Sequence, residues 1–204
     1  LPLTFMQRQM WFIHQLDEGS AHYHMQSRFE LEGEFDPDAL HRALRRLMQR
    51  HESLRTVFRM RDGEPNQLVL DGCEPGWTEV DLRDLHDARL TELRTSHARQ
   101  DALRPFDLAH DAMLRATVLH LPQARFDLLL TLHHIAGDGW SLDLLNQELG
   151  ALYRHEAHSE ALQLPSLPVQ YADYSVWQAE TLTGDRLEAL LQHWNVQLEG
   201  MPTL

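Results

Sequence analysis

The chain has 204 residues, of which 43% are hydrophobic and 24% are charged, and this composition is typical of one globular domain. Thirty-one acidic and eighteen basic residues give a formal net charge of −13, which argues against nucleic acid as a partner because phosphate backbones would be repelled. The single cysteine, Cys73, cannot form an intramolecular disulfide and favours a reducing, cytoplasmic setting. No apolar run approaches the ~20 residues that a membrane span requires, so we predict no membrane partner.

The first part of the chain alternates between helical and strand-like apolar patterns. The predicted elements are a helix over residues 3–16, a strand over 25–35, a helix that ends near residue 51, and a hairpin of strands 54–58 and 67–70. The second of these helices has the strongest local signal, because Asp36 is a typical N-cap and Pro37 a typical first-turn residue.

The second part of the chain continues the same alternation. The predicted elements are a polar helix over 85–103, a turn at 105–108, a hairpin of strands 113–121 and 125–133, a helix over 140–153, and helices over 171–182 and 186–198. Pro165 and Pro168 punctuate a linker before the last two helices. Strands that are interleaved with helices and joined partly by hairpins predict an α/β two-layer sandwich with a mixed, largely antiparallel sheet.

The residues with the clearest chemistry, HHIAGDGWS, occupy positions 133–141, where a predicted buried strand ends in a glycine-containing turn. The alternation of the strand places His133 and His134 on opposite faces. Imidazole titrates near neutral pH, so a positioned His134 could accept a proton from an attacking amine or hydroxyl. We expect Gly137 and Gly139 to adopt positive φ and to let substrate approach the backbone closely.

Asp138 has three possible roles in this turn: it could orient the ring of His134, cap the following helix, or pair with a buried arginine. Of these roles, we favour pairing with a buried arginine. The simplest alternative interpretation is that His133 and His134 are satisfied side chains at a strand end, with Asp138 and Ser141 as helix caps.

Several other kinds of site have no support in the sequence. The remaining histidines, which include His22, His24, His155 and His158, offer no spacing for three ligands, so we expect them at the surface and predict no metal site. The chain has no lysine for a phosphate-binding loop and no Gly-x-Ser-x-Gly elbow. Nucleotide hydrolysis and serine acyl-enzyme chemistry are therefore not predicted.

Four ordered segments resemble the condensation domains of nonribosomal peptide synthetases. Residues 133–139 match the family pattern His-His-x-x-x-Asp-Gly, and the segments 3–11, 50–58 and 171–177 are similar to the first, second and fourth motifs of that family. The pattern His-x-x-x-Asp-Gly is also shared by chloramphenicol acetyltransferases, plant-type acyltransferases and wax-ester synthases. The order of all four segments therefore carries the resemblance, which covers residues 4–204.

This resemblance implies a chloramphenicol acetyltransferase-like fold in which residues 1–204 form the N-terminal lobe, with a possible linker to a missing C-terminal lobe from about 165–204. Because the chain begins at Leu1 and not at methionine, we also expect it to come from a longer polypeptide. The implied activity is peptide-bond formation between a donor acyl or peptidyl thioester and an acceptor aminoacyl thioester, in antibiotic or siderophore biosynthesis. We expect the isolated lobe to be inactive.

The resemblance also implies partners and site residues. The partners are donor and acceptor peptidyl carrier proteins, which deliver 4'-phosphopantetheine arms to a chain that binds no cofactor of its own, the C-terminal lobe, and an adjacent adenylation domain. The catalytic motif comprises His133, His134, Asp138 and Gly139, with His134 as general base or positioning group. We predict that Arg50, or as second choice Arg55, pairs with Asp138 and that Gly137 supports the loop. Side chains predicted to line a tunnel or pack between lobes are Trp11, Trp140, Ser141 and Tyr171.

Related functions remain open. An epimerisation domain usually carries its tryptophan further along after Asp-Gly, whereas Trp140 follows directly here. A heterocyclisation domain replaces the double histidine with spaced aspartates. A starter domain with a free fatty acyl donor, or a noncatalytic module that docks a carrier protein, is also compatible with the sequence.

Overall fold

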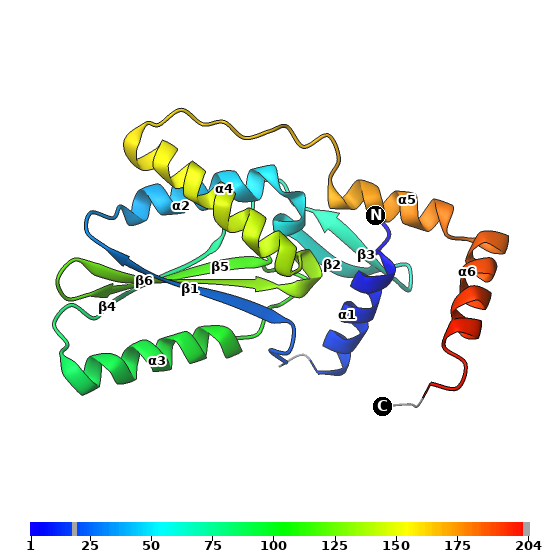
Figure 1. Cartoon of the computed structure of the whole chain (residues 1–204), viewed down its shortest axis with the longest axis horizontal. Coiled ribbons are helices and arrows are strands. Elements are labelled where there is room, and N and C mark those ends of the chain that lie inside the picture. The colour runs from blue at the N-terminus through cyan, green and yellow to red at the C-terminus, as the bar shows by residue number, and fades with distance from the viewer. Residues whose placement is uncertain (18–19, 202–204) are drawn as a thin grey trace.

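The computed structural model of the protein describes residues 1–17 and 20–201 (Figure 1). The last three residues of the predicted lobe, 202–204, and residues 18–19 lie outside the described part. The elements are, in chain order, α1 (Phe5–Leu16), β1 (His24–Glu32), α2 (Pro37–Arg50), η1 (Glu52–Arg55), β2 (Thr56–Arg61), β3 (Glu64–Val69), β4 (Gly76–Asp81), α3 (Asp87–Leu103), β5 (Leu114–Leu121), β6 (Arg125–His133), η2 (His134–Ala136), α4 (Gly139–His158), α5 (Tyr171–Thr181) and α6 (Gly184–Gln197).

A four-stranded sheet of order β1-β6-β5-β4 forms the centre of the molecule. β6 runs antiparallel to both β1 and β5, whereas β4 and β5 are parallel. β2 and β3 form a separate antiparallel ribbon. The predicted α/β fold with a mixed, largely antiparallel sheet flanked by helices is confirmed, as are both predicted hairpins. Helices cover both faces of this sheet, so it forms the middle of three layers and not one of the two that the sequence predicts. β4 and the short helices η1 and η2 were not predicted.

Helices α2 and α4 cover one face of the sheet, as Figure 1 shows. Asp36 caps α2 by accepting a hydrogen bond from the backbone N of Ala39, as its sequence predicts. The largest apolar cluster lies between these helices and the sheet, and it includes Leu40, Leu44 and Leu47 of α2, Leu145, Leu149 and Leu152 of α4, and Leu128, Leu130 and Leu132 of β6. The even-numbered leucines of β6 therefore all point toward α2 and α4.

Helix α3 covers the opposite face of the sheet, as Figure 1 shows. It packs there through an apolar cluster that includes Leu90 and Leu119, and through buried polar contacts. Its buried residues are Leu90 and Asp101. Asp101 accepts hydrogen bonds from Thr117, 3.0 Å away on β5, and from Thr131 on β6. Nearer the start of the helix, Arg94 donates two hydrogen bonds of 2.7 Å to Asp127 of β6. Buried carboxylates, each with several donors, thus attach α3 to the sheet.

The amino-terminal segment, the β2–β3 ribbon and α5 meet around the side chain of Gln67. Its Nε2 donates to the backbone oxygen of Pro2 at 2.7 Å and to Oγ of Ser175 at 2.8 Å. Thr4, which caps α1, lies 3.3 Å from the hydroxyl of Tyr171. Three segments that are distant in the sequence therefore share one buried polar network.

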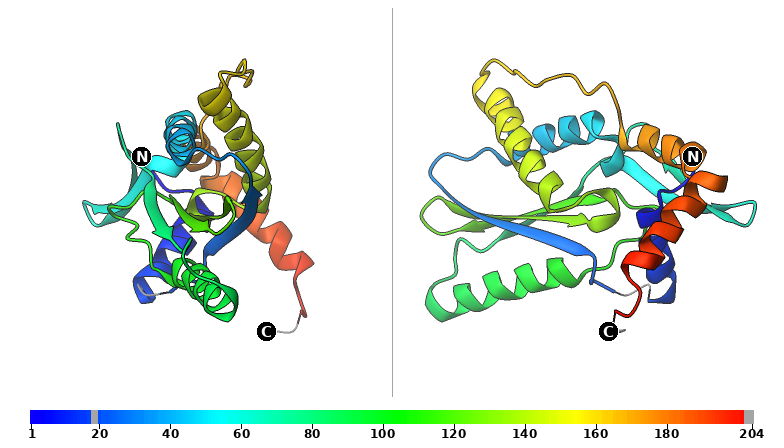
Figure 2. Two further views of the ribbon diagram at one scale, coloured as in Figure 1. Left: turned by 90° about the vertical axis from the view of Figure 1, so that its left-hand side faces the viewer. Right: turned by 45° about the vertical axis from the view of Figure 1, so that its right-hand side comes forward.

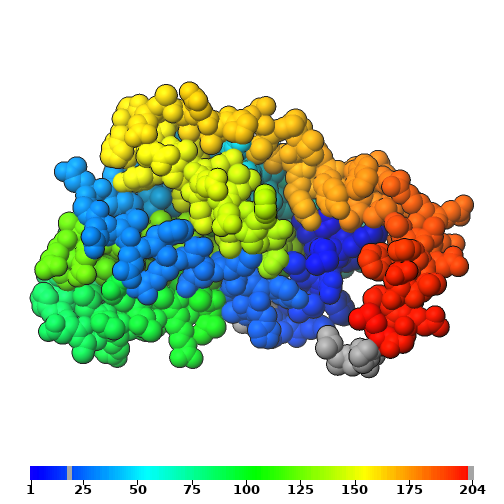
Figure 3. Space-filling view, viewed as in Figure 1, coloured from blue at the N-terminus to red at the C-terminus, as the bar shows by residue number. Residues whose placement is uncertain are grey.

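Helix α6 projects from the body of the molecule, as Figures 2 and 3 show. None of its residues is buried, and Trp194 is 57% exposed. On α5, Ala172 and Ser175 are buried, whereas Trp177 is 49% exposed. The linker role predicted for residues 165–204 stays a prediction. Within the described ranges, no helix combines the length and apolarity needed to cross a lipid bilayer.

Candidate functional site

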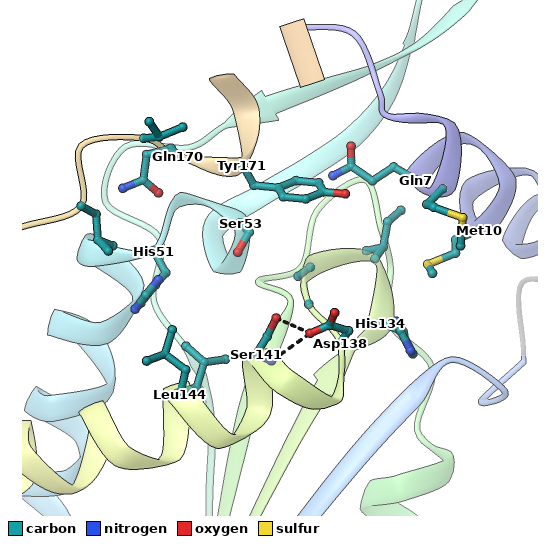
Figure 4. A pocket seen from close by; sticks show the side chains of 17 residues that line it. Gln7, Met10, His51, Ser53, His134, Asp138, Ser141, Leu144, Gln170 and Tyr171 are labelled. Atoms are coloured by element: carbon teal, nitrogen blue, oxygen red, sulfur yellow. Dashed lines mark hydrogen bonds between the residues drawn. The ribbon is translucent and has the colours of Figure 1, made fainter. Parts of the chain in front are cut away.

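A cavity of about 470 Å³ opens beside the end of β6 (Figure 4). Its walls come from α1, η1, η2, the start of α4, the connector before α5 and the first residue of α5. The lining residues are Met6, Gln7, Met10, His51, Ser53, His134, Ile135, Ala136, Gly137, Asp138, Ser141, Leu144, Leu145, Leu167, Val169, Gln170 and Tyr171. Apolar atoms make up most of the wall, and polar side chains from several elements also reach it, a combination that is usual for a small-molecule site.

The two adjacent histidines occupy different environments. β6 ends at His133, which is 2% exposed, and its Nδ1 accepts a hydrogen bond of 3.1 Å from the backbone N of Ile135. His134 begins η2, lines the cavity, and is anchored through its backbone N to the oxygen of Tyr23 at 2.8 Å. The structure therefore places His134, and not His133, where a ligand could reach it. The catalytic role of His134 stays a prediction.

Burial also makes the His133 ring harder to protonate than a free imidazole. Desolvation lowers the pKa of His133 from its ordinary value of 6.5 to about 3, and the neighbouring His24, His14, His134 and Arg115 contribute to the same shift. The ring packs 5.7 Å from those of both His24 and Phe106. His133 is therefore a neutral packing residue whose Nδ1 holds the turn.

The expectation that the other histidines lie at the surface is wrong for His14 and His24, and also for His51 and His120, whose side chains are 14% and 18% exposed. His14 is 9% exposed, and its ring lies 6.2 Å from that of His133. His24 is half-buried, and its Nδ1 lies 2.8 Å from the backbone oxygen of Ala102. Both lie beside His133, next to the His-His-x-x-x-Asp-Gly motif. Across residues 1–17 and 20–201, no group of three or more His, Cys, Asp or Glu side chains is placed to hold a metal ion.

Asp138 caps α4 and does not pair with an arginine, so the favoured pairing with Arg50 is wrong. Its Oδ1 accepts hydrogen bonds from the backbone N of Ser141 at 2.8 Å and from Oγ of Ser141 at 2.7 Å (Figure 4). These bonds hold the pKa of Asp138 below its ordinary value. Unpaired N–H groups at a helix start need acceptors, and Asp138 stands at that position.

The two candidate arginines have other partners. Arg50 donates to Glu148 from Nε at 3.0 Å and from Nη2 at 3.2 Å. Glu148 lies ten residues after Asp138 on α4, and a rise of 1.5 Å per residue separates them by roughly 15 Å. Arg55, the second choice, donates to the backbone oxygens of Met48 at 3.2 Å and Leu70 at 2.6 Å. Arg50 thus supports α4 at its middle and not the turn that contains Asp138.

The expectation of positive φ at the two glycines is also wrong. Gly137 has a φ of 179°, an extended conformation that any residue can adopt, and Gly139 is not among the glycines with positive φ. A Cβ on Gly137 would lie 2.9 Å from Cβ of Ser141 and 3.3 Å from Cδ2 of Leu132. Gly137 is therefore needed for close packing, whereas a Cβ on Gly139 would meet open space.

The residues predicted to line a tunnel or pack between lobes divide into two groups. Ser141 and Tyr171 line the cavity. Trp140 is 85% exposed, and Trp11 packs, partly buried, on a second apolar cluster around Met10 and Ile135.

Four polar residues that line the cavity were not predicted from the sequence. They are Gln7, His51, Ser53 and Gln170. Gln7 lies inside the first motif. His51 and Ser53 lie inside the second motif, so the sequence could have identified them as candidate site residues. Gln170 directly precedes the fourth motif and has no signal of its own.

The fold and the site agree with the results of comparison with known protein families. The Condensation domain family matches residues 1–204, and the chain belongs to that family. It is 42% identical over 204 residues to one of the linear gramicidin synthase proteins of Brevibacillus parabrevis, covering 100% of this chain and 3% of that protein. It is 42% identical over 203 residues to phosphinothricin tripeptide synthetase PhsB of Streptomyces viridochromogenes, covering 100% and 17%.

Solved structures show the same fold. A complex of the X-domain and OxyB from teicoplanin biosynthesis contains a chain that is 28% identical, with a TM-score of 0.86 over 98% of this chain and 44% of that one. The first condensation domain of the calcium-dependent antibiotic synthetase, in complex with a substrate analogue, is 24% identical, with a TM-score of 0.79 over 98% and 48%. The chain therefore spans less than half the length of these structures.

The two motif glycines provide a matched pair of substitutions. We expect Gly137→Ala to lower the unfolding free energy by roughly 1–3 kcal/mol, because the added methyl group forces the start of α4 to shift. Gly139→Ala lies at the first residue of α4 in open space, so its stability should equal or slightly exceed that of the wild type. Urea unfolding measures both, and equal losses would contradict the packing argument.

Asp138→Ala should cost about 1 kcal/mol of unfolding free energy, the usual loss for an N-cap. Asp138→Asn retains an acceptor oxygen for Ser141 and should lose less. Chemical denaturation of the two variants at neutral pH provides the comparison. A loss above about 3 kcal/mol for Asp138→Ala would instead indicate a broken buried charge pair.

His133 should make stability fall in acid. The folded protein keeps His133 neutral down to about pH 3, whereas the unfolded chain binds a proton below about pH 6.5, so the unfolding free energy decreases between these values as pH falls. The contribution is at most roughly 5 kcal/mol. His133→Asn keeps an acceptor for Ile135 but does not titrate. The stability difference between the two proteins, measured from pH 8 to pH 4, should therefore shrink below pH 6.5, and a constant difference would contradict it.

Proposed function

We propose that the chain is the histidine-bearing N-terminal lobe of a condensation domain that forms peptide bonds between two carrier-bound thioesters. The observation that carries this proposal is the position of His134, which lines a largely apolar cavity at the end of a buried strand. His133, its neighbour in the motif, is sealed in the interior. His134 is therefore the histidine of the pair that can touch a substrate.

The proposed reaction in this cavity is the aminolysis of a thioester. The acceptor amine attacks the carbonyl carbon of the donor thioester, a C–N bond forms, and the C–S bond breaks. The proton lost by the amine ends on the released phosphopantetheine thiol, and His134 either carries it or holds the amine in place. Apolar walls exclude water, which would otherwise hydrolyse the thioester, and fixed positions for both reactants contribute to the rate.

The partners follow from the same proposal. Donor and acceptor carrier proteins present the two arms, an adenylation domain loads the acceptor, and a C-terminal lobe completes the cavity. Support for a second lobe comes from the solved relatives, of which this chain covers 44% and 48%. The exposed apolar side chains of α5 and α6 fit the same arrangement. The lobe alone is then inactive.

A recruitment role is the second candidate. The X-domain that shares this fold at 28% identity was solved as a complex with OxyB. A lobe of this kind can therefore present a docking surface to another enzyme. An accessible His134 favours condensation over recruitment, because docking does not require a histidine in a cavity.

We expect His134→Ala, in the complete domain with loaded carriers, to reduce peptide formation by about 100-fold or more, the usual loss for a group that handles a proton. His158→Ala, at the exposed end of α4, is the matched control and should be fully active. Product is measured by mass spectrometry after single turnovers. Unchanged product formation by His134→Ala would remove His134 from the mechanism.

A further inference from the structure

A second histidine lines the same cavity as His134, and the proposed reaction gives it no role. His51 lies between α2 and η1, and its side chain is 14% exposed. Figure 4 places His51 and His134 on opposite sides of the cavity. A chain-like substrate that spanned the cavity would therefore pass between these two residues.

Glu148 fixes the ring of His51. Nε2 of His51 lies 2.6 Å from Oε2 of Glu148, a residue of α4 that is 5% exposed. Because a carboxylate only accepts hydrogen bonds, Nε2 carries the proton in this contact. In the tautomer with the proton on Nε2, Nδ1 is a hydrogen-bond acceptor, and none of the hydrogen bonds found among residues 1–17 and 20–201 reaches it. Glu148 thus selects both the orientation and the tautomer of His51.

Arg50 in turn fixes Glu148. It binds both carboxylate oxygens, and its Nη2 also donates to the backbone oxygen of Pro165 at 2.5 Å. Burial alone would raise the pKa of Glu148, but the hydrogen bonds from Arg50 and His51 hold it below the ordinary value. The carboxylate therefore stays charged and is held from two sides, which makes it a rigid support for the imidazole.

The backbone around His51 is held as well. The side chain of Gln170 donates to the oxygen of Arg50 at 3.1 Å and accepts from the N of Glu52 at 3.2 Å. These contacts lie immediately before and after His51 in the chain. A purely structural role would be complete with Arg50 and Glu148, which satisfy each other's charges. It does not require an imidazole on the cavity wall.

We propose that His51 is a substrate-binding residue of the cavity, with Glu148 as its positioning residue, and that Nδ1 of His51 accepts a hydrogen bond from an N–H of the thioester substrate. This inference rests on the proposed function, because it assigns His51 to the substrate of that reaction. The N–H belongs either to an amide of the pantetheine arm or to the aminoacyl group. Both present the same donor to the ring.

Nitrogen NMR on the 204-residue chain with labelled histidine tests the orientation directly, without any reaction. We expect His51 to be the Nε2–H tautomer in the wild type at pH 8. Glu148→Gln, whose amide can either donate or accept, should populate both tautomers. An Nδ1–H tautomer for His51 in the wild type would overturn the inference.

The binding step is tested in the complete domain with His51→Gln. The Gln amide reaches the position of Nε2 and keeps a donor for Glu148, but it has no acceptor at the position of Nδ1. We expect the Kd for aminoacyl-pantetheine, measured by calorimetry, to rise about three- to tenfold, with KM rising in parallel and kcat unchanged. His158→Gln is the matched control and should match the wild type. An unchanged Kd for His51→Gln would show that His51 does not bind the substrate and would contradict the proposal.

An aminoacyl alkyl thioester, which lacks the amides of the arm, identifies the source of the N–H. If the arm supplies it, the difference in Kd between wild type and His51→Gln disappears with this compound; if the aminoacyl group supplies it, the difference persists. Both results support the assignment of His51. Because Kd is measured without bond formation, loss of the condensation proposal through His134→Ala would leave this test intact.

Discussion

Strand β6 lies between β1 and β5, and its burial on both faces fixes the positions of the residues that follow it. Its even-numbered leucines hold α2 and α4, whereas Asp127 and Thr131 hold α3 on the other face. A shift of one residue in the pairing of this strand would move each side chain to the opposite face of the sheet. The site therefore depends on the register of β6 with its neighbours, because His133 is its last residue.

The two faces of the sheet differ in how many buried charges they carry. On the side of α2 and α4, the contact is apolar and gains from the removal of hydrocarbon from water. On the side of α3, Asp101 and Asp127 are buried, and each needs several donors to offset desolvation. Glu148 is a third buried carboxylate, and it lies among α2, α4 and the connector. Arg94 binds Asp127 and Arg50 binds Glu148, so arginines supply part of the compensation that these buried carboxylates need.

Much of the fold could be predicted from local signals. Asp36 and Pro37 begin α2 as expected, and the hairpins follow from alternating apolar residues. β4 was missed because it is a partly exposed edge strand with polar residues, and its parallel partner β5 lies about thirty residues further along the chain. Parallel pairing leaves no turn signal next to the strand.

The motif itself was found from sequence, but its internal contacts were not. Spacing in sequence cannot tell which carboxylate a given arginine will reach, and Arg50 binds Glu148 and not Asp138 because of the length of α4 between them. The burial of His14 and His24 depends on how α1 and β1 fold back beside His133. Neither contact has a local signature, since each joins segments that are far apart in the chain.

The exposed apolar side chains of α6 affect the behaviour of the chain in solution. A 14-residue helix without buried side chains is marginal in water, and it presents Leu191, Trp194 and Val196 to the solvent. Contiguous exposed apolar side chains promote self-association, whereas a net charge of −13 opposes it through repulsion between molecules. Salt screens that repulsion, so the colloidal stability of this chain depends on ionic strength more than that of a protein whose apolar surface is covered.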